Sequence, residues 1–157
     1  MTKFTQLVVF SLDEQLYALP LAAVERIVRA AELTPLPKAP AIVLGVIDVA
    51  GRILPVLNVR QRLRLPRCEI NPAHQFLIAN TTRRSVVLAI DEAMDVIEVP
   101  ADEIVDAREI VPMLEQIRGV VKLRGDLVLI HDLEEFLSLE EERALEEAMT
   151  EETSHGV

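Results

Sequence analysis

The residue types that most often carry out chemistry in proteins are sparse in this sequence. The three histidines, His74, His131 and His155, lie far apart, and only His131 falls in a predicted strand. A histidine that ends an apolar strand is usually a structural residue rather than a catalytic one. Cys68 is the only cysteine, which excludes an internal disulfide and a multi-cysteine metal site.

One acidic cluster, Asp91, Glu92 and Asp95, has the composition of an acid–base site. Acidic residues in a turn between strands are usually solvated, however, and we expect that here. The glycines are never clustered as in a phosphate-binding loop, and the G-x-S-x-G and H-E-x-x-H motifs are absent. The sequence therefore predicts a protein that is not an enzyme, with no catalytic residue, no metal ligand and no cofactor.

Composition narrows the class further. Half of the 157 residues are hydrophobic, which allows a sizeable core, and the net charge of −10 is concentrated at the C-terminal end. With no Trp, one Tyr and four Phe, the chain lacks the stacking platforms of single-strand nucleic-acid binders. No apolar run approaches the ~20 residues of a membrane span, and residues 1–6 do not resemble a signal peptide. We expect a cytoplasmic protein that binds no nucleic acid and does not insert into a membrane.

Two stretches of the chain repeat one pattern. In residues 43–63 two short β-branched runs flank Gly51, and Asn58 then stands at a helix N-cap position with Gln61 three residues later. Residues 117–137 repeat this pattern at an offset of 74, with Gly119 and Gly125 in place of Gly45 and Gly51. We interpret this as an internal duplication.

The duplication extends towards the N-terminus. Residues 7–12, 16–20 and 24–27 resemble residues 76–80, 85–90 and 94–97 at an offset near 70. Short apolar strands separated by frequent turns are typical of an all-β sandwich or barrel. One copy is too small to bury much surface alone, so we expect the two copies to pack together and to form a groove where they meet.

Three local features give further expectations. Apolar residues at positions 21, 24, 27 and 28 share one helical face, which predicts a short helix over Leu21–Val28. Pro55 predicts that its strand lies at a sheet edge or a bulge. Ser138 and Glu141 form a capping box for an acidic C-terminal helix, whose narrow apolar stripe predicts a small contribution to stability. We therefore divide the chain into residues 1–138 and an acidic helix and tail over 139–157.

In this order and spacing, several short segments resemble the CheW-like domain, the coupling protein of bacterial chemotaxis. The resemblance covers residues 7–137. Its carriers include Tyr17-Ala18-Leu19-Pro20, Val24-Glu25-Arg26-Ile27, Gly51-Arg52-Ile53-Leu54-Pro55 and Ile117-Arg118-Gly119-Val120. The resemblance implies two intertwined five-stranded SH3-like barrels with short helices and a C-terminal helix. It also implies a non-enzymatic scaffold that links the cytoplasmic tip of a chemoreceptor to the regulatory domain of a chemotaxis histidine kinase, recruited to receptor arrays at the membrane.

The resemblance also implies where those two partners bind. The receptor tip is expected in an apolar groove between the barrels and at the glycine turn beside it. The expected receptor-binding residues are Val24, Arg26, Ile27, Val28, Ala50, Arg52, Glu92, Ala93 and Val96. The expected kinase-binding residues are Val46, Ile53, Met113 and Leu114.

One departure from the family pattern bears on receptor binding. The family's turn usually reads Asn-Leu-Arg-Gly, and here it reads Asp48-Val49-Ala50-Gly51, so Ala50 replaces the arginine. Arg52 could compensate if it swings from the same turn. Two alternatives stay open: a CheW-like homologue that serves pilus motility or a second-messenger circuit or acts as a competitor, and a generic small-barrel peptide-binding module.

Overall fold

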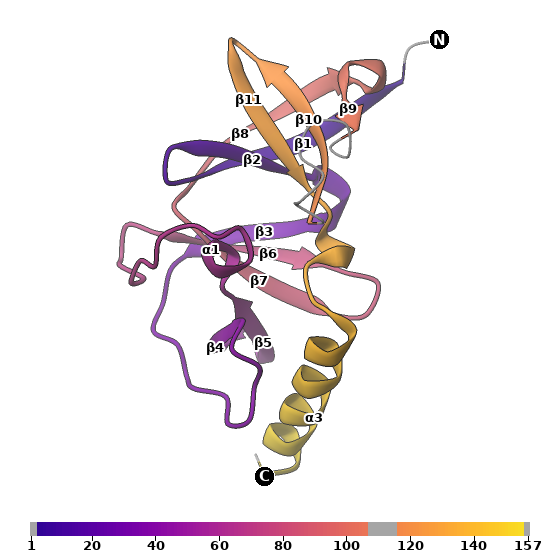
Figure 1. Cartoon of the computed structure of the whole chain (residues 1–157). Helices are drawn as coiled ribbons and strands as arrows, with labels where there is room; N and C mark the ends of the chain where they lie inside the picture. The colour runs from indigo at the N-terminus through magenta and orange to yellow at the C-terminus, as the bar shows by residue number, and fades with distance from the viewer. Residues whose placement is uncertain (1–2, 107–115, 156–157) are drawn as a thin grey trace.

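The computed structural model describes the backbone of residues 3–106 and 116–155, and side chains as far as residue 150. Its strands form two mixed sheets, which lie one above the other in Figure 1. The upper sheet, here called the first barrel, has the order β8 (Glu92–Pro100), β1 (Phe4–Leu12), β2 (Gln15–Pro20), β11 (Asp126–His131), β10 (Ile117–Leu123), β9 (Val105–Asp106). The lower sheet, the second barrel, has the order β3 (Val24–Arg29), β6 (Gln75–Asn80), β7 (Ser85–Ile90), β5 (Arg52–Leu57), β4 (Val43–Val49).

The two copies of the duplication exchange strands. The β1–β2 hairpin of the first copy lies in one sheet between β8 and β11 of the second copy, while the β6–β7 hairpin of the second copy lies between β3 and β5 of the first. The strand β3 therefore corresponds to β8, and their registers against β6 and β1 match at an offset of 69: Arg29 lies opposite Gln75, and Glu98 lies opposite Gln6. This exchange confirms the expected all-β fold with two intertwined barrels.

Each barrel is closed by the chain that continues from its exchanged strand. After β8 and the 3-10 turn η2 (Ala101–Glu103), β9 pairs with β10, and after β3, Thr34 bridges to β4. The closing chain passes so near two glycines that a Cβ at Gly45 would lie 2.7 Å from the Thr34 carbonyl oxygen. A Cβ at Gly119 would lie 2.8 Å from the Ile104 side chain. The repeated glycine therefore exists because only a residue without a side chain lets each barrel close.

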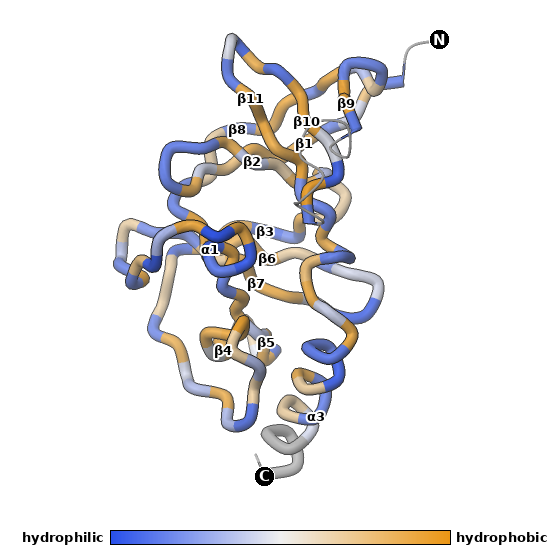
Figure 2. Tube along the Cα trace, in the orientation of Figure 1, coloured by the Kyte–Doolittle hydropathy of each residue, from blue (hydrophilic) through white to orange (hydrophobic). Residues whose placement is uncertain are grey.

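Hydrophobic residues pack in three separate clusters. One lies inside the first barrel, around Leu7, Val9 and Val128, and one inside the second, around Phe76 and Val56. The largest cluster lies between the barrels, and we call it the shared core. It is built from the opposite faces of the same strands, because alternate residues of a strand point to opposite sides. Figure 2 shows mostly hydrophobic residues along these strands and hydrophilic ones at the β1–β2 turn.

The hairpin turns and caps of the two copies agree with the duplication. Residues Ala50 and Gly51 have φ of 52° and 87°, and Arg124 and Gly125 have φ of 49° and 87°, which is the paired left-handed backbone of a type I′ turn. The Asn58 side chain accepts a hydrogen bond from the backbone N–H of Gln61, and α1 (Val59–Arg62) begins where predicted. In the second copy a 3-10 turn, η3 (Leu133–Glu135), takes its place.

The helix expected over Leu21–Val28 is wrong. Only the 3-10 turn η1 (Leu21–Ala23) is helical, and β3 follows it directly. The register of β3 against β6 shifts between Val24 and Arg26, so Glu25 is an extra residue in a β-bulge. The bulge turns Val24 and Ile27 to the same face, and this spacing of three residues imitates a helix in the sequence.

The expectation that Pro55 marks an edge strand is also wrong. The strand β5 has neighbours on both sides, β4 and β7. Its parallel pairing with β7 covers only Val56 and Leu57, so it begins immediately after the proline. The missing N–H of Pro55 therefore costs the β5–β7 ladder no hydrogen bond.

The C-terminal helix α3 (Leu139–His155) begins at the predicted capping box. The backbone N–H of Ser138 donates to Glu141 Oε1 at 2.8 Å, and the N–H of Glu141 donates to Ser138 Oγ at 3.1 Å. Its apolar stripe is not weakly packed, because Leu145 and Ala148 are buried in the shared core. The division of the chain after residue 138 stays a prediction, but the helix packs on the same core as both barrels.

Candidate functional site

The exchanged strands β3 and β8 each lie at one end of their sheet and carry matching apolar residues. In β8 the register against β1 also shifts, so that Met94 is the bulged residue as Glu25 is in β3. Val24 and Ala93 occupy equivalent positions before the bulge, and Ile27 and Val96 occupy equivalent positions after it.

These four residues, Val24, Ile27, Ala93 and Val96, form what we call the inter-barrel strip. Their cross-strand partners all belong to the shared core. Three of them are half-buried against that core, whereas Val96 is 51% exposed. The strip is therefore the place where the shared core meets solvent along two edge strands.

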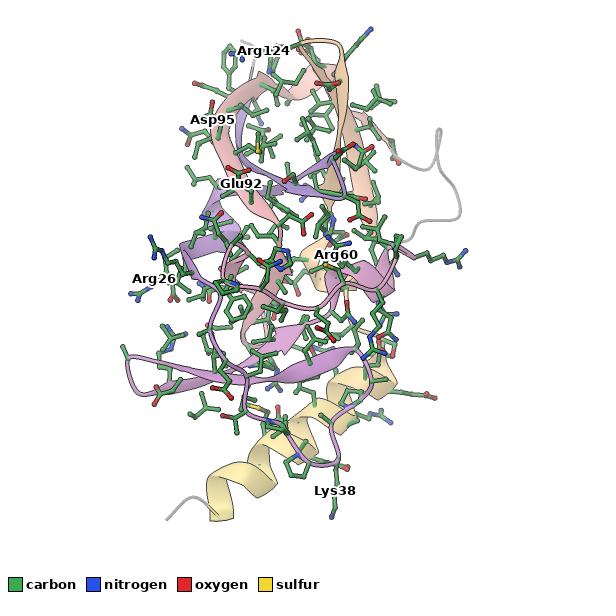
Figure 3. All side chains as sticks on the ribbon, turned by 90° about the vertical axis from the view of Figure 1, so that its left-hand side faces the viewer. Arg26, Lys38, Arg60, Glu92, Asp95 and Arg124 are labelled. Atoms are coloured by element: carbon green, nitrogen blue, oxygen red, sulfur yellow. The ribbon has the colours of Figure 1, made fainter. Side chains whose placement is uncertain are left out.

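The other residues expected at a receptor site divide between surface and interior. Arg26 and Glu92 are exposed. Figure 3 shows Arg26 on the second barrel, with Glu92 and Asp95 above it on the same side of the molecule. Val28, in contrast, packs against the cluster inside the second barrel, because it alternates with Ile27. The structure thus places Val28 apart from the strip.

The glycine turn beside the strip differs from the expectation at Arg52. Ala50 is exposed at the turn, and Asp48 Oδ1 accepts a hydrogen bond from the N–H of Gly51 at 2.8 Å. Arg52 does not swing freely from this turn. Its Nη1 lies 3.1 and 3.0 Å from the two carboxylate oxygens of Glu25, and its Nη2 lies 2.6 Å from Ser85 Oγ. The guanidinium is therefore occupied within the chain.

The expected kinase-binding residues also differ in access. Ile53 is 45% exposed at the start of β5. Val46 is only 4% exposed and belongs to the shared core, so its side chain is not available to a partner. Met113 and Leu114 lie outside the described residues.

A charged contact that the sequence did not predict joins the barrels. Arg60, on α1, places Nη1 2.6 Å from Asp13 Oδ1 and Nη2 2.6 Å from Asp91 Oδ1. Burial alone would lower the pKa of Arg60, but the hydrogen bonds to Asp13 and Asp91 outweigh it and raise that pKa. Asp91 is thus a partner in an ion pair, and the expectation of a merely solvated acidic turn is wrong for it. No sequence signal pointed to this contact, because its members are 47 and 31 residues apart.

The equivalent position of the second copy binds a neutral partner. Glu134, 74 residues after Arg60, accepts hydrogen bonds from the backbone N–H and the hydroxyl of Thr82, at 2.8 and 2.9 Å. Thr82 stands in the β6–β7 turn, 69 residues after Asp13 in the β1–β2 turn. In both copies, therefore, a residue that follows the last strand of that copy binds a hairpin turn of the other barrel.

His131 lies in the shared region among aromatic rings, where it has no solvent access. Its ring centroid is 5.6 Å from that of Phe10, 5.1 Å from that of Tyr17 and 6.2 Å from that of Phe136. Among the described residues, neither ring nitrogen has a hydrogen-bond partner. Burial lowers the pKa of His131 to about 3, so the imidazole is neutral at pH 7. This setting agrees with the structural role expected from the sequence.

A pocket of about 530 Å³ beside Arg60 is lined by residues of the 67–74 loop and by apolar residues such as Leu33 and Leu44. Within residues 3–106 and 116–155 no group of three or more His, Cys, Asp or Glu side chains is placed to hold a metal ion. In the same part of the chain, no helix combines the length and the apolar character that crossing a bilayer requires. The geometry therefore directs attention to the inter-barrel strip as a protein-binding surface.

Comparisons with known proteins identify the family of this chain. A family model described as the CheW-like domain matches residues 6–141. A chemotaxis protein CheW of Rhizobium meliloti (strain 1021) is 32% identical over 99 residues, which are 63% of this chain and 64% of that protein. One from Treponema pallidum (strain Nichols) is 30% identical over 103 residues, which are 63% of this chain and 61% of that protein. The match thus spans less than two thirds of each of these relatives.

A solved structure shares the fold. The scaffolding protein TtCheW from Thermoanaerobacter tengcongensis superposes with a TM-score of 0.80 at 22% sequence identity, over 90% of this chain and 96% of that one. At this identity the likeness establishes the architecture of the two barrels.

Proposed function

The chain belongs to the CheW-like domain family, and on that premise we propose that it is a non-enzymatic scaffold that couples a chemoreceptor to a chemotaxis-type histidine kinase. The observation that carries this proposal is the inter-barrel strip. It sets apolar side chains from two edge strands beside each other at the opening of the shared core, and exposed apolar surface of this kind marks protein-binding sites. We place the protein in the cytoplasm, at receptor arrays.

Two separate faces support two partners. The cytoplasmic tip of a receptor would lie on the strip, between β3 and β8, with Arg26, Ala50 and Glu92 at its borders. The regulatory domain of the kinase would contact the second barrel at the start of β5, where Ile53 offers exposed apolar surface on the strand face opposite to Arg52. Val46, on the neighbouring strand β4 opposite Pro55, is buried in the shared core and is not part of this contact surface.

The turn next to the strip supports a specialised receptor partner. Ala50 supplies no charged donor, and Arg52 is already bound to Glu25 and Ser85. A receptor tip that relies on an arginine at this turn would find none available. We therefore propose that the chain couples receptor tips that do not rely on an arginine at this turn.

The proposal is tested by disabling one face at a time. Val96→Asp should abolish binding of the full chain to a receptor-tip fragment in titration calorimetry and leave binding to the kinase regulatory domain unchanged. Ile53→Asp should do the reverse. Leu139→Asp is the matched control, because Leu139 is 67% exposed at the start of α3, away from both faces. Loss of neither interaction, with all three variants folded by far-UV circular dichroism, would refute the assignment of the two faces.

A further inference from the structure

The two sides of the inter-barrel strip have nearly the same shape. The strands β3 and β8 are equivalent in register, in their bulges and in their place at the sheet ends. A partner with two similar arms, such as a helical hairpin, would therefore fit the strip in two orientations related by the internal symmetry. Shape alone does not choose between them, so another property must do so.

Charge distinguishes the two sides. Arg26 on β3 corresponds to Asp95 on β8, and Arg29 corresponds to Glu98, in both cases at the offset of 69. All four side chains are exposed. The structure records no ion pair for them among the described residues, and Asp95 Oδ1 accepts only the N–H of Val96, at 2.7 Å. Every equivalent pair of charged positions is thus inverted in sign.

The other charges on β3 and β8 preserve this contrast, although Arg124, from the β10–β11 turn, lines one pocket together with Asp95 and Asp126. On β3 the only acid is Glu25, and its ion pair with Arg52 cancels it, so the β3 side stays positive. On β8, Glu92 adds a further exposed negative charge near the start of the strand. Arg29 shares the strand face of Ile27 and Glu98 shares that of Val96, so these two residues give the strip a positive border and a negative border. Arg26, Glu92 and Asp95 carry the same signs on the adjoining strand faces, and Figure 3 shows all three on one side of the molecule.

We propose that this polarity sets the orientation of the receptor hairpin: the arm beside β3 is acidic, and the arm beside β8 is basic. The inference rests on the proposed function and specifies the partner of the same site. Each ion pair with the receptor would be exposed and would contribute little free energy. In the reversed orientation, however, each arm would face charges of its own sign. Charge patterns of this kind govern register and orientation more than affinity. Charge complementarity also makes the preference weaken as the salt concentration rises.

A second copy of this chain is the competing occupant. In a twofold dimer β3 of one copy would face β8 of the other, and the two inverted charge pairs would complement each other twice. The experiment must therefore measure self-association as well as receptor binding.

The test uses charge reversal on the full-length chain. One variant carries Arg26→Glu and Arg29→Glu, a second carries Asp95→Arg and Glu98→Arg, and a third carries all four changes, which restores the net charge and inverts the polarity. The probe is a purified two-helix tip fragment of a chemoreceptor from the source organism. Orientation is read by a photo-crosslinker on Met94→Cys, an exposed bulge residue of β8, in a Cys68→Ser background.

We expect each two-residue reversal to weaken binding at least about tenfold at low salt, and the fourfold variant to bind within about threefold of the wild type. The crosslink from position 94 should move from the basic arm of the tip to the acidic arm in the fourfold variant. Unchanged affinity in both reversals, or a crosslink that stays on one arm, would overturn the inference while leaving the scaffold function standing.

Two further results separate the possible failures. If the wild type does not bind the tip and Val96→Asp changes nothing, the proposed function fails, and the orientation inference fails with it. If sedimentation of the wild type alone shows a dimer that both reversals dissolve and the fourfold variant re-forms, the strip holds a second copy, which overturns the inference. Urea midpoints near the wild-type value in all variants show that these results do not arise from unfolding.

Discussion

The two contacts that fasten the barrels to each other occupy equivalent positions and use opposite chemistry. In the first copy Arg60 reaches the β1–β2 turn, and in the second Glu134 reaches the β6–β7 turn. The Arg60 side chain is only 11% exposed and holds two carboxylates, whereas Glu134 and Thr82 are exposed. The contact therefore lies at equivalent positions in the two copies but joins different types of residue.

The second copy adds a contact that the first lacks. After α1 the chain enters the loop before β6, but after η3 it continues into α3. Arg62 of α1 binds Glu141 of α3, and Arg84 of the β6–β7 hairpin binds Glu142 and Glu146. Burial in the acidic helix would raise the pKa of Glu141, but the hydrogen bonds from Ser138 and Arg62 outweigh it and lower that pKa. The second copy, whose turn contact through Glu134 is the more exposed one, thus also has a helix that packs on the shared core.

The largest effect on stability is expected when that helix loses its anchor. Leu145→Ala should lower the free energy of unfolding by about 2–5 kcal/mol, because a fully buried leucine leaves a cavity in the shared core. Urea denaturation measures the change. Leu139→Ala, on the same helix but exposed, should change it by less than about 0.5 kcal/mol. Equal effects of the two would mean that α3 is only loosely attached.

The two turn contacts should differ next. Arg60→Ala should cost about 2–3 kcal/mol, since it leaves Asp13 and Asp91 close together without their cation, but both carboxylates keep some solvent. Glu134→Ala should cost no more than about 1 kcal/mol, as expected of exposed hydrogen bonds. Arg67→Ala, an exposed arginine near Arg60, is the control. A larger loss from Glu134→Ala than from Arg60→Ala would reverse the comparison.

The two copies should also differ in how pH affects stability, because His131 of the second copy stands at the position of Leu57 in the first. Unfolding returns the pKa of His131 from about 3 to its ordinary value of 6.5, so the unfolded chain binds the proton first as the pH falls. The stability contributed by the neutral ring is complete above pH 6.5 and is lost between pH 6.5 and 3, by about 2 kcal/mol at pH 5.

His131→Leu should remove this loss, since leucine does not titrate, and should also remove two unpartnered ring nitrogens from the core. Thermal unfolding of both proteins at pH 7 and pH 5 compares them. If the variant loses as much stability as the wild type on acidification, other groups account for the acid sensitivity.

The smallest effect concerns the two glycine turns. Ala50→Arg gives the first turn the residue that the second has at Arg124, and both positions have the same left-handed backbone. Stability should therefore change by less than about 0.5 kcal/mol. Binding of a typical receptor tip should tighten by up to about tenfold, the value of one partly exposed charge-assisted contact. Unaltered binding in calorimetry would show that this turn does not touch the receptor.

Sequence reasoning succeeded where the causes are local. The turns at 51 and 125 and the cap at Asn58 are set by nearby backbone, and together with the repeated glycines 45 and 119 they revealed the duplication and the barrels. It failed at β3, because a single bulged residue gives a strand the spacing of a helix.

The candidate site was less accessible to prediction for a related reason. The apolar patterns of β3 and β4 do not show which cluster each side chain joins, so the burial of Val28 and Val46 depends on the folded arrangement. The ion pairs of Arg60 with Asp91 and of Arg52 with Glu25 join distant parts of the chain, so local sequence spacing does not predict them.

The central claim, a scaffold with two separate faces, is tested most directly by mass photometry of the chain mixed with a receptor-tip fragment and the kinase regulatory domain. The account predicts a particle with the mass of all three components, which Val96→Asp reduces to chain plus kinase domain and Ile53→Asp reduces to chain plus receptor tip. Two partners that bind the wild type only one at a time, or neither at all, would contradict it.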